Sequence, residues 1–135
     1  MKINKPLYYI LNLTWGLIMT FIGAVGALAL LLSGRRPFRN GGGWCFRIGK
    51  NWGGVSFGLF YFVDEIAPKH TLYHEYGHSL QNAIWGPLMI PIIAIPSGIR
   101  YQIFNWRSRH HRPNPPYDSI WFEGQATRWG TETFD

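Results

Sequence analysis

The sequence His74-Glu75-Tyr76-Gly77-His78 constrains the fold of this chain more than any other stretch. On a helix, residues four apart lie on the same face, so His74 and His78 can direct their imidazoles at one metal ion. Glu75 then lies beside the metal, where it can accept a proton from a water molecule whose pKa the metal lowers from about 15.7 to about 7. A catalytic zinc site usually has three protein ligands. The rest of the chain must therefore return a third ligand to this helix.

The residues around the motif favour a helix. Apolar Leu72, Tyr76 and Leu80 recur every four residues, as on the buried face of an amphipathic helix. Gly77 costs a helix about 1 kcal/mol relative to alanine, which indicates close backbone packing at that point. Two alternatives stay open: a chance arrangement of surface histidines, and a metal site with a purely structural role.

The composition points to a membrane. Hydrophobic residues make up 47% of the chain, and only 15% of its residues are charged, whereas charged residues usually reach about 25%. The net charge is +6, but the arginines stand beside apolar stretches, which suits anionic lipid headgroups, and no nucleic-acid-binding motif is present. We therefore expect a lipid bilayer as a partner and no nucleic acid. The arginines in question are Arg35, Arg36, Arg39, Arg100, Arg107, Arg109 and Arg112.

The stretch from Leu7 to Leu32 contains no charged residue. As one helix it would be about 39 Å long, against a hydrocarbon core of about 30 Å. It predicts an N-terminal transmembrane helix, with residues 1–36 as the anchor and residues 37–135 as a minimal zincin-like catalytic domain. The basic residues that follow predict a cell (inner) membrane protein whose catalytic part faces the cytoplasm.

Two stretches have the composition of strands. Trp44 to Ile48 and Trp52 to Val63 are rich in aromatic and β-branched residues and are separated by a short polar turn, which predicts a short β-hairpin. The hairpin would cover the motif helix with apolar surface, and an exposed edge of it could pair with an extended peptide.

The apolar stretch from Ile84 to Ile99 is interrupted by three prolines. Its 16 residues would cover about 24 Å as a helix, too short to cross a bilayer. A crossing would also separate the motif from a ligand in the C-terminal part. We therefore predict a re-entrant or interfacial segment over residues 84–106, with its turn at Pro96-Ser97-Gly98; a buried core helix is the alternative.

A C-terminal helix is predicted to carry the third ligand. Ile120, Trp121, Ala126 and Trp129 are spaced as one apolar helical face. Glu123 is favoured because it is expected in the middle of this helix and because Ala126, three residues later, lets two helices approach closely. The other candidate carboxylates are Asp118, Glu132 and Asp135, and His70, His110 and His111 are interpreted as surface or supporting residues.

H-E-x-x-H followed by E-x-x-A resembles the gluzincin metallopeptidases, particularly the integral-membrane CAAX prenyl protease, HtpX and BlaR types. The order of motifs from Leu72 to Gly130 is also similar to that of a group of small bacterial membrane proteins. These motifs are the residues from His74 to Gln81, Gly86-Pro87-Leu88, Pro96-Ser97, and the residues from Glu123 to Gly130. The resemblance implies that His74, His78 and Glu123 bind zinc and that Glu75 is the catalytic base.

One position departs from the family pattern. Those families usually have an aspartate where this chain has Thr127, and that aspartate orients a zinc-binding histidine. A threonine hydroxyl can accept the same hydrogen bond without the charge, and loss of such a partner can cost about 10- to 100-fold in metal affinity or activity. Tyr76, Tyr117 and Arg128 are candidates for stabilising the oxyanion.

These observations predict an α+β membrane protein that hydrolyses a peptide or membrane-protein substrate near the bilayer surface with the help of zinc. An inactive zinc- or peptide-binding relative of the same fold is the first alternative, and a structural membrane subunit is the second.

Overall fold

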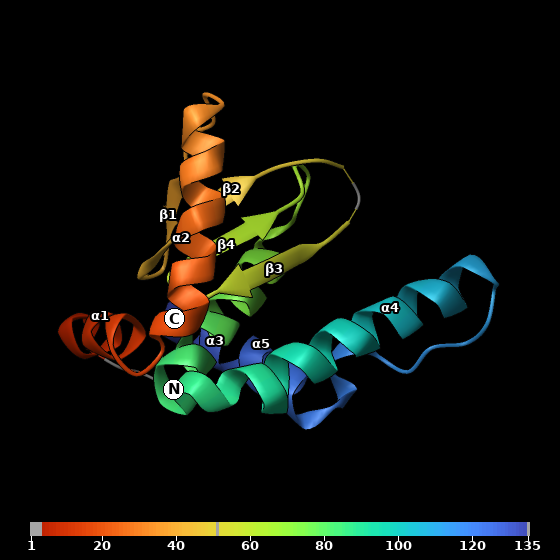
Figure 1. The fold of residues 1–135 in the computed structure, drawn as a ribbon. Helices are drawn as coiled ribbons and strands as arrows, with labels where there is room; N and C mark the ends of the chain where they lie inside the picture. The colour runs from red at the N-terminus through yellow and green to blue at the C-terminus, as the bar shows by residue number, and fades with distance from the viewer. Residues whose placement is uncertain (1–3, 51, 135) are drawn as a thin grey trace.

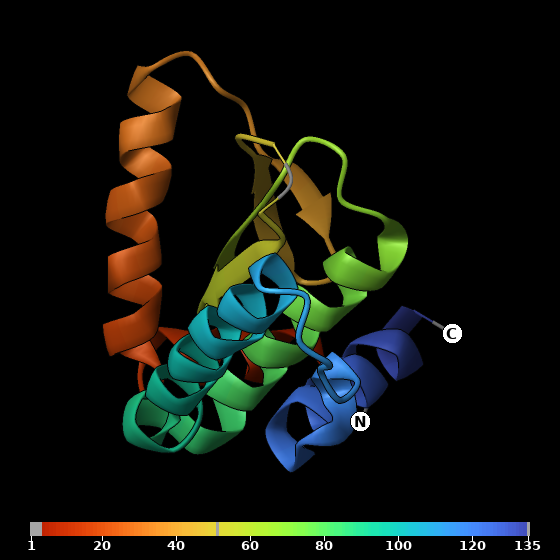
Figure 2. The same cartoon turned by 90° about the vertical axis from the view of Figure 1, so that its right-hand side faces the viewer.

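The computed structural model describes residues 4–50 and 52–134 as five α-helices, a four-stranded sheet and three short helical turns. In Figures 1 and 2 the sheet lies between α2 on one face and α3 on the other, and α5 packs on α3. The elements in order are α1 (Lys5–Leu13), α2 (Leu17–Leu32), β1 (Phe38–Asn40), β2 (Gly43–Arg47), β3 (Gly54–Phe57), β4 (Phe60–Val63), α3 (Lys69–Trp85), η1 (Gly86–Leu88), η2 (Ile90–Ala94), α4 (Ile95–Arg109), η3 (Tyr117–Ser119) and α5 (Trp121–Phe134).

The predicted single hairpin is wrong, because the sheet has four strands in the order β1-β2-β4-β3. The stretch from Trp52 to Val63 contains both β3 and β4, which pair antiparallel, whereas β2 runs parallel to β4 with Cys45 opposite Tyr61. Gly58 makes the extra turn possible: it has a φ of 64° and lies against Thr20, where a side chain would not fit. The edge strands are therefore β1 and β3.

The central strands are buried on both faces. Cys45, Tyr61 and Val63 pack with residues of α1 and α3, while Phe46 and Phe62 pack against Ala27 of α2. Because successive side chains of a strand point to opposite faces, this alternation places one helical layer on each side of the sheet. Helix α3 is therefore packed directly against the buried face of the sheet.

The predicted transmembrane helix over residues 7–32 is also wrong. The stretch forms two helices, α1 and α2, whose axes meet at 89°. Among the described residues no single helix is long and apolar enough to cross a membrane; only two bent helix pairs, Lys5–Leu13 with Leu17–Leu32 and Lys69–Leu88 with Ile90–Arg109, reach that length and composition together. The observed fold is therefore a mixed one, with five helices and a small sheet.

Buried polar contacts explain the bend between α1 and α2. The Tyr8 hydroxyl is hydrogen bonded to the Ser79 hydroxyl of α3, and the Asn82 side chain donates to Asn12 Oδ1 at 2.6 Å. Asn82 also donates to the carbonyl of Gly16 at the bend, at 3.1 Å. These bonds hold α1 against α3. If α1 continued straight on from α2, it would not reach α3.

The chain turns earlier than expected after α3. The predicted turn at residues 96–98 is wrong, because α3 with η1 and the following helix meet at 119° near Met89. Gly86, with a φ of 58°, ends α3, and η2 continues without a break into α4, so that Pro96 lies inside a helical segment that begins at Ile90. As a result α4 is one continuous helix, and none of its residues, all of which the structure describes, is buried.

Candidate metal centre

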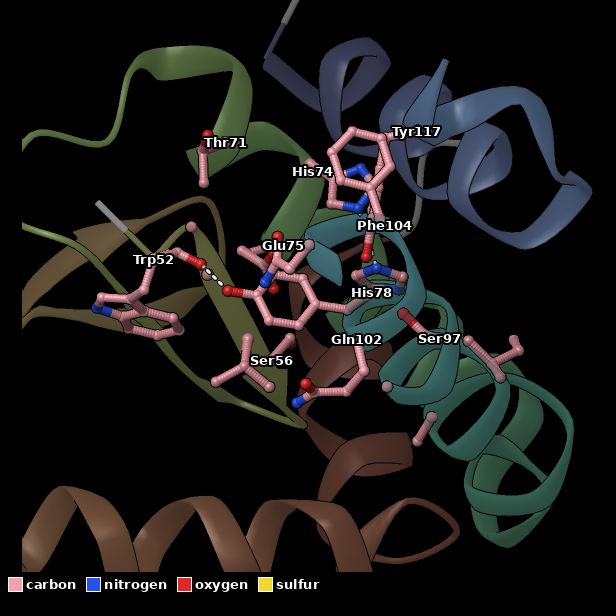
Figure 3. Close-up of a pocket in the computed structure, with 18 of the residues that line it drawn as sticks. Trp52, Ser56, Thr71, His74, Glu75, His78, Ser97, Gln102, Phe104 and Tyr117 are labelled. Atoms are coloured by element: carbon pink, nitrogen blue, oxygen red, sulfur yellow. Dashed lines mark hydrogen bonds between the residues drawn. The ribbon is translucent and has the colours of Figure 1, made fainter. Parts of the chain in front are cut away.

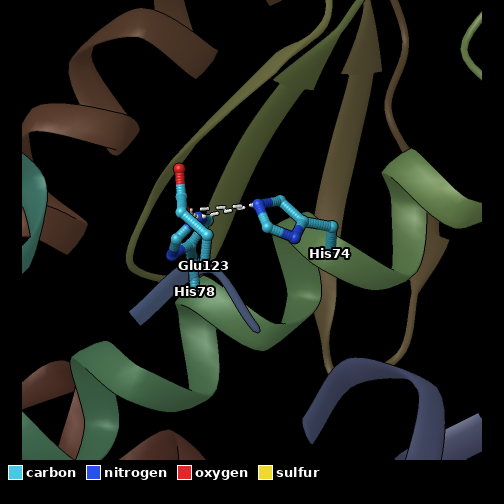
Figure 4. Close-up of side chains that lie close together, drawn as sticks. All are labelled: His74, His78 and Glu123. Atoms are coloured by element: carbon cyan, nitrogen blue, oxygen red, sulfur yellow. Dashed lines mark hydrogen bonds and ion pairs between the residues drawn. The ribbon is translucent and has the colours of Figure 1, made fainter. Parts of the chain in front are cut away.

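Three side chains from two helices converge at one point. Figure 4 shows His74 and His78 on α3 and Glu123 on α5 pointing toward one another. Glu123 Oε1 lies 2.8 Å from His78 Nε2 and 3.5 Å from His74 Nε2, and the two Nε2 atoms are 3.1 Å apart. All three residues are buried, and together they could hold a metal ion.

The spacing of these atoms fits a small tetrahedral ion. Ligand atoms about 2.1 Å from a tetrahedral zinc lie about 3.4 Å from one another, and the three separations in this site lie between 2.8 and 3.5 Å. Apart from the two imidazoles, Glu123 Oε1 has no hydrogen-bond partner among the described residues. A buried carboxylate oxygen of this kind needs a cation or a proton beside it.

Small residues allow α5 to bring its ligand to α3. A side chain at Gly77 would overlap the backbone of Ala126, and one at Gly130 would overlap the carbonyl of Tyr73. The close approach expected at Ala126 is therefore present. Glu123 lies in the first turn of α5 and not in the middle of the helix as predicted.

Gln81 determines which nitrogen of His78 faces Glu123. The Gln81 amide nitrogen donates to the carbonyl of Phe122 at 2.8 Å, so its oxygen faces His78 Nδ1, also at 2.8 Å. An amide oxygen only accepts, which means that Nδ1 carries a proton. In neutral His78 the Nε2 lone pair therefore points at the carboxylate, as a metal ligand requires.

Thr127 contacts the outer nitrogen of His74, as Gln81 contacts that of His78. Its hydroxyl lies 2.8 Å from His74 Nδ1, which leaves Nε2 facing Glu123. This is the contact that the sequence suggested for the residue replacing an aspartate. Both histidines are thus held by their outer nitrogens.

The charges of the site are strongly coupled. Burial by itself lowers the pKa of His78, but its bond to Glu123 and the charges of Glu75 and Glu123 raise that pKa to about 9. Burial by itself raises the pKa of Glu123, yet its bonds to both histidines hold the pKa well below its usual range. Without metal, a proton on His78 therefore lies against the carboxylate, and a bound cation would take its place.

Glu75 lies beside the three ligands without sharing their cluster. Its side chain is buried next to Gly54 of β3, and its Oε2 atom has no hydrogen-bond partner among the described residues. Burial raises the pKa of Glu75, and the nearby charge of Glu123 raises it further, while the two histidines act in the opposite direction. Such a carboxylate is suited to accepting and returning a proton.

A cleft of about 860 Å³ opens onto these residues. Figure 3 shows His74, Glu75 and His78 on its floor, with Ser56 of β3 and Ser97 and Gln102 of α4 around them. Part of its lining is apolar and is formed by Met19, Phe57, Met89 and Ile93. The hydroxyl of Tyr101 donates to the carbonyl of Trp52, so α4 is bonded to the chain leading into the edge strand β3.

Of the three residues predicted to stabilise the oxyanion, one lines the cleft and two do not. Tyr117 lines the cleft with its ring centroid 6.2 Å from that of His74, whereas Tyr76 packs against Tyr8 in the core and Arg128 is exposed.

The other histidines and carboxylates do not join the ligand cluster as the structure describes it. His70 lines the cleft, His110 stacks on Trp106, and His111 is exposed. The side chains of Asp118 and Glu132, and the whole of Asp135, lie outside what the structure describes.

Two contributors were missed from the sequence. Gln81 could have been found, because it lies three residues after His78 and therefore on the same helical face. Ser97, which donates to Glu123 Oε2 at 3.0 Å, was named with Pro96 as a shared motif but was interpreted as part of a turn, and nothing in its local sequence indicated a contact with Glu123. Comparison of the chain with models of protein families, with curated proteins and with solved structures gives no match.

Proposed function

We propose that this chain is a zinc-dependent metallopeptidase of the gluzincin type, with His74, His78 and Glu123 as ligands and Glu75 as the catalytic base. The observation that carries the proposal is the convergence of the three ligand atoms, all within 4.8 Å of one another. Two imidazoles and one carboxylate are a ligand set of catalytic zinc sites, which keep the fourth position open.

The ligand types and Glu75 favour zinc and hydrolysis. Calcium and magnesium prefer oxygen ligands alone, so two imidazoles count against both. Two histidines and one carboxylate also bind iron in oxygenases. A second carboxylate buried beside the ligands, as Glu75 is, suits proton transfer during hydrolysis.

The chain supplies the proton transfers of the reaction. A zinc ion in this site would polarise the scissile carbonyl and lower the pKa of a water molecule. Glu75 accepts the proton of the attacking water and passes it to the leaving nitrogen, which balances the hydrolysis. Tyr117, which lines the cleft near His74, is the oxyanion donor that we favour among the three candidates.

The substrate that we propose is an extended peptide, or a membrane-protein segment at a lipid surface. The edge strand β3 borders the cleft and offers backbone groups for pairing with a peptide. Large apolar side chains are exposed on α2 and α4, such as Phe21 at 65% and Ile99 at 57%, and such surfaces often contact lipid or protein. Location at a cell membrane, with the cleft facing the cytoplasm, stays a prediction.

Elemental analysis and peptide hydrolysis by the purified protein test the proposal. We expect about one zinc per chain. Glu75→Gln should keep the metal and lose hydrolysis, and Glu123→Ala should lose both. Glu65→Ala, which removes an exposed carboxylate paired only loosely with Arg35 at 3.8 Å, is the matched control and should keep both.

Other outcomes identify the alternatives. Bound zinc without any hydrolysis by the unmodified protein would support the alternative of an inactive zinc-binding protein of the same fold. We consider that alternative because Thr127 stands where the resembled families usually have an aspartate. Absence of bound metal would reject the proposal and leave the structural role. Iron in place of zinc would point to a different reaction.

A further inference from the structure

The two oxygens of Glu123 have different surroundings. Oε1 faces both imidazoles, whereas Oε2 accepts a hydrogen bond from the Ser97 hydroxyl at 3.0 Å. The Glu123 side chain is completely buried, so water does not compete for either oxygen. Ser97 comes from α4, a helix that supplies none of the proposed ligands.

We propose that Ser97 is a positioning residue that holds Glu123 as a one-oxygen ligand. This inference rests on the proposed metal site. A carboxylate can bind a cation through one oxygen or through both. With Oε2 engaged by a hydroxyl, Oε1 alone is presented to the ion, and the position that the second oxygen would occupy stays open for water and substrate.

Hydrogen bonds from the neighbouring Arg100 help to place Ser97 beside Glu123. Arg100, one turn further along α4, donates to the carbonyls of Tyr117 and Pro116 and to the Ser119 hydroxyl. These groups lie in the segment directly before α5. The start of α4 is therefore bonded both to the ligand itself and to the chain that leads to it, and the Ser97 hydroxyl meets Glu123 as a consequence of that alignment.

Zinc affinity and coordination test the role of Ser97. Zinc affinity is measured by competition with a chelator, and carboxylate coordination by X-ray absorption of the zinc-loaded protein. Ser97→Ala should weaken zinc binding by about 10- to 100-fold and bring a second oxygen of Glu123 toward the ion. Ser97→Thr keeps the hydroxyl and should restore both readings. Ser33→Ala, which removes an exposed hydroxyl that donates to the carbonyl of Leu30, should change neither.

The outcomes separate this inference from the proposed function. If the unmodified protein binds no zinc, the proposed function fails, and this inference fails with it. If the unmodified protein and Ser97→Ala bind zinc equally tightly with the same coordination, only the role of Ser97 is rejected. Circular dichroism checks folding. If Ser97→Ala alone does not fold, it is combined with Gly98→Ala, whose methyl group meets nothing within 4 Å and favours the helix, with the same expected and contrary results.

Discussion

The two helices that flank the metal centre, α5 and α4, reach Glu123 by different means. Helix α5 carries Glu123 and packs its backbone against α3 at Gly77 and Gly130. No residue of α4 is buried, and side-chain hydrogen bonds from Ser97 and Tyr101 help to hold it. Segments with little buried apolar surface open at a lower free energy than core elements. The ligand thus lies on a rigid helix, while the helix that lines the cleft opposite β3 is the one able to move.

A glycine-to-alanine substitution at the α3–α5 contact and one in α4 should have opposite effects on stability. Gly77→Ala should reduce the free energy of unfolding by about 3 kcal/mol, because the new methyl group meets the Ala126 backbone and forces two helices apart. Gly98→Ala on α4 meets nothing within 4 Å, and it should stabilise the protein by up to about 1 kcal/mol through helix propensity. Urea denaturation measures both.

Equal destabilisation by the two substitutions would contradict the difference between the helices. A harmless Gly77→Ala would show that α5 does not pack as closely as described. A strongly destabilising Gly98→Ala would show that α4 is packed in solution against something else.

This contrast also explains which parts of the structure could be predicted from the sequence. The α3–α5 side follows from local spacing: two histidines four apart, and a glutamate three residues before an alanine. The α1–α2 bend does not, because it depends on Asn82 bonding to Asn12 and Gly16, which lie far away in the sequence. A hydropathy pattern records only that the stretch from Leu7 to Leu32 lacks charge. The contact between Ser97 and Glu123 is hidden for the same reason.

Metal binding should stabilise α3 and α5 more than it stabilises α4. Zinc at 100 times its dissociation constant should raise the free energy of unfolding by about 2.7 kcal/mol, because only the folded chain brings the three ligands together. Amide hydrogen exchange should slow in α3 and α5, and it should stay fast in the last turns of α4. Glu123→Ala should show no stabilisation, and uniform protection of α4 would mean that this helix is as firmly packed as α5.

The support of His74 by α5 should contribute less than the metal itself. Thr127→Val removes the hydroxyl that lies 2.8 Å from His74 Nδ1, and it should weaken zinc binding by about 10- to 100-fold, or about 1.4 to 2.7 kcal/mol. Thr127→Ser keeps the hydroxyl and should bind as the unmodified protein does. Isothermal titration calorimetry measures both affinities, and equal affinities for the valine and serine variants would exclude this role.

The smallest effect is expected where α4 is bonded across the cleft. Tyr101→Phe removes the hydroxyl that donates to the Trp52 carbonyl, and it should cost about 1 kcal/mol or less of unfolding free energy. Tyr9→Phe removes a hydroxyl away from the cleft, which donates to the carbonyl of Gly42 at 2.6 Å and accepts from Arg39 at 2.6 Å. Both should lower stability slightly, but only Tyr101→Phe should speed amide exchange in α4, because α4 lacks the packing that would keep it in place once the bond is lost. Unchanged exchange in α4 would show that its remaining bonds, from Ser97 and Arg100, are enough to hold this helix closed over the site.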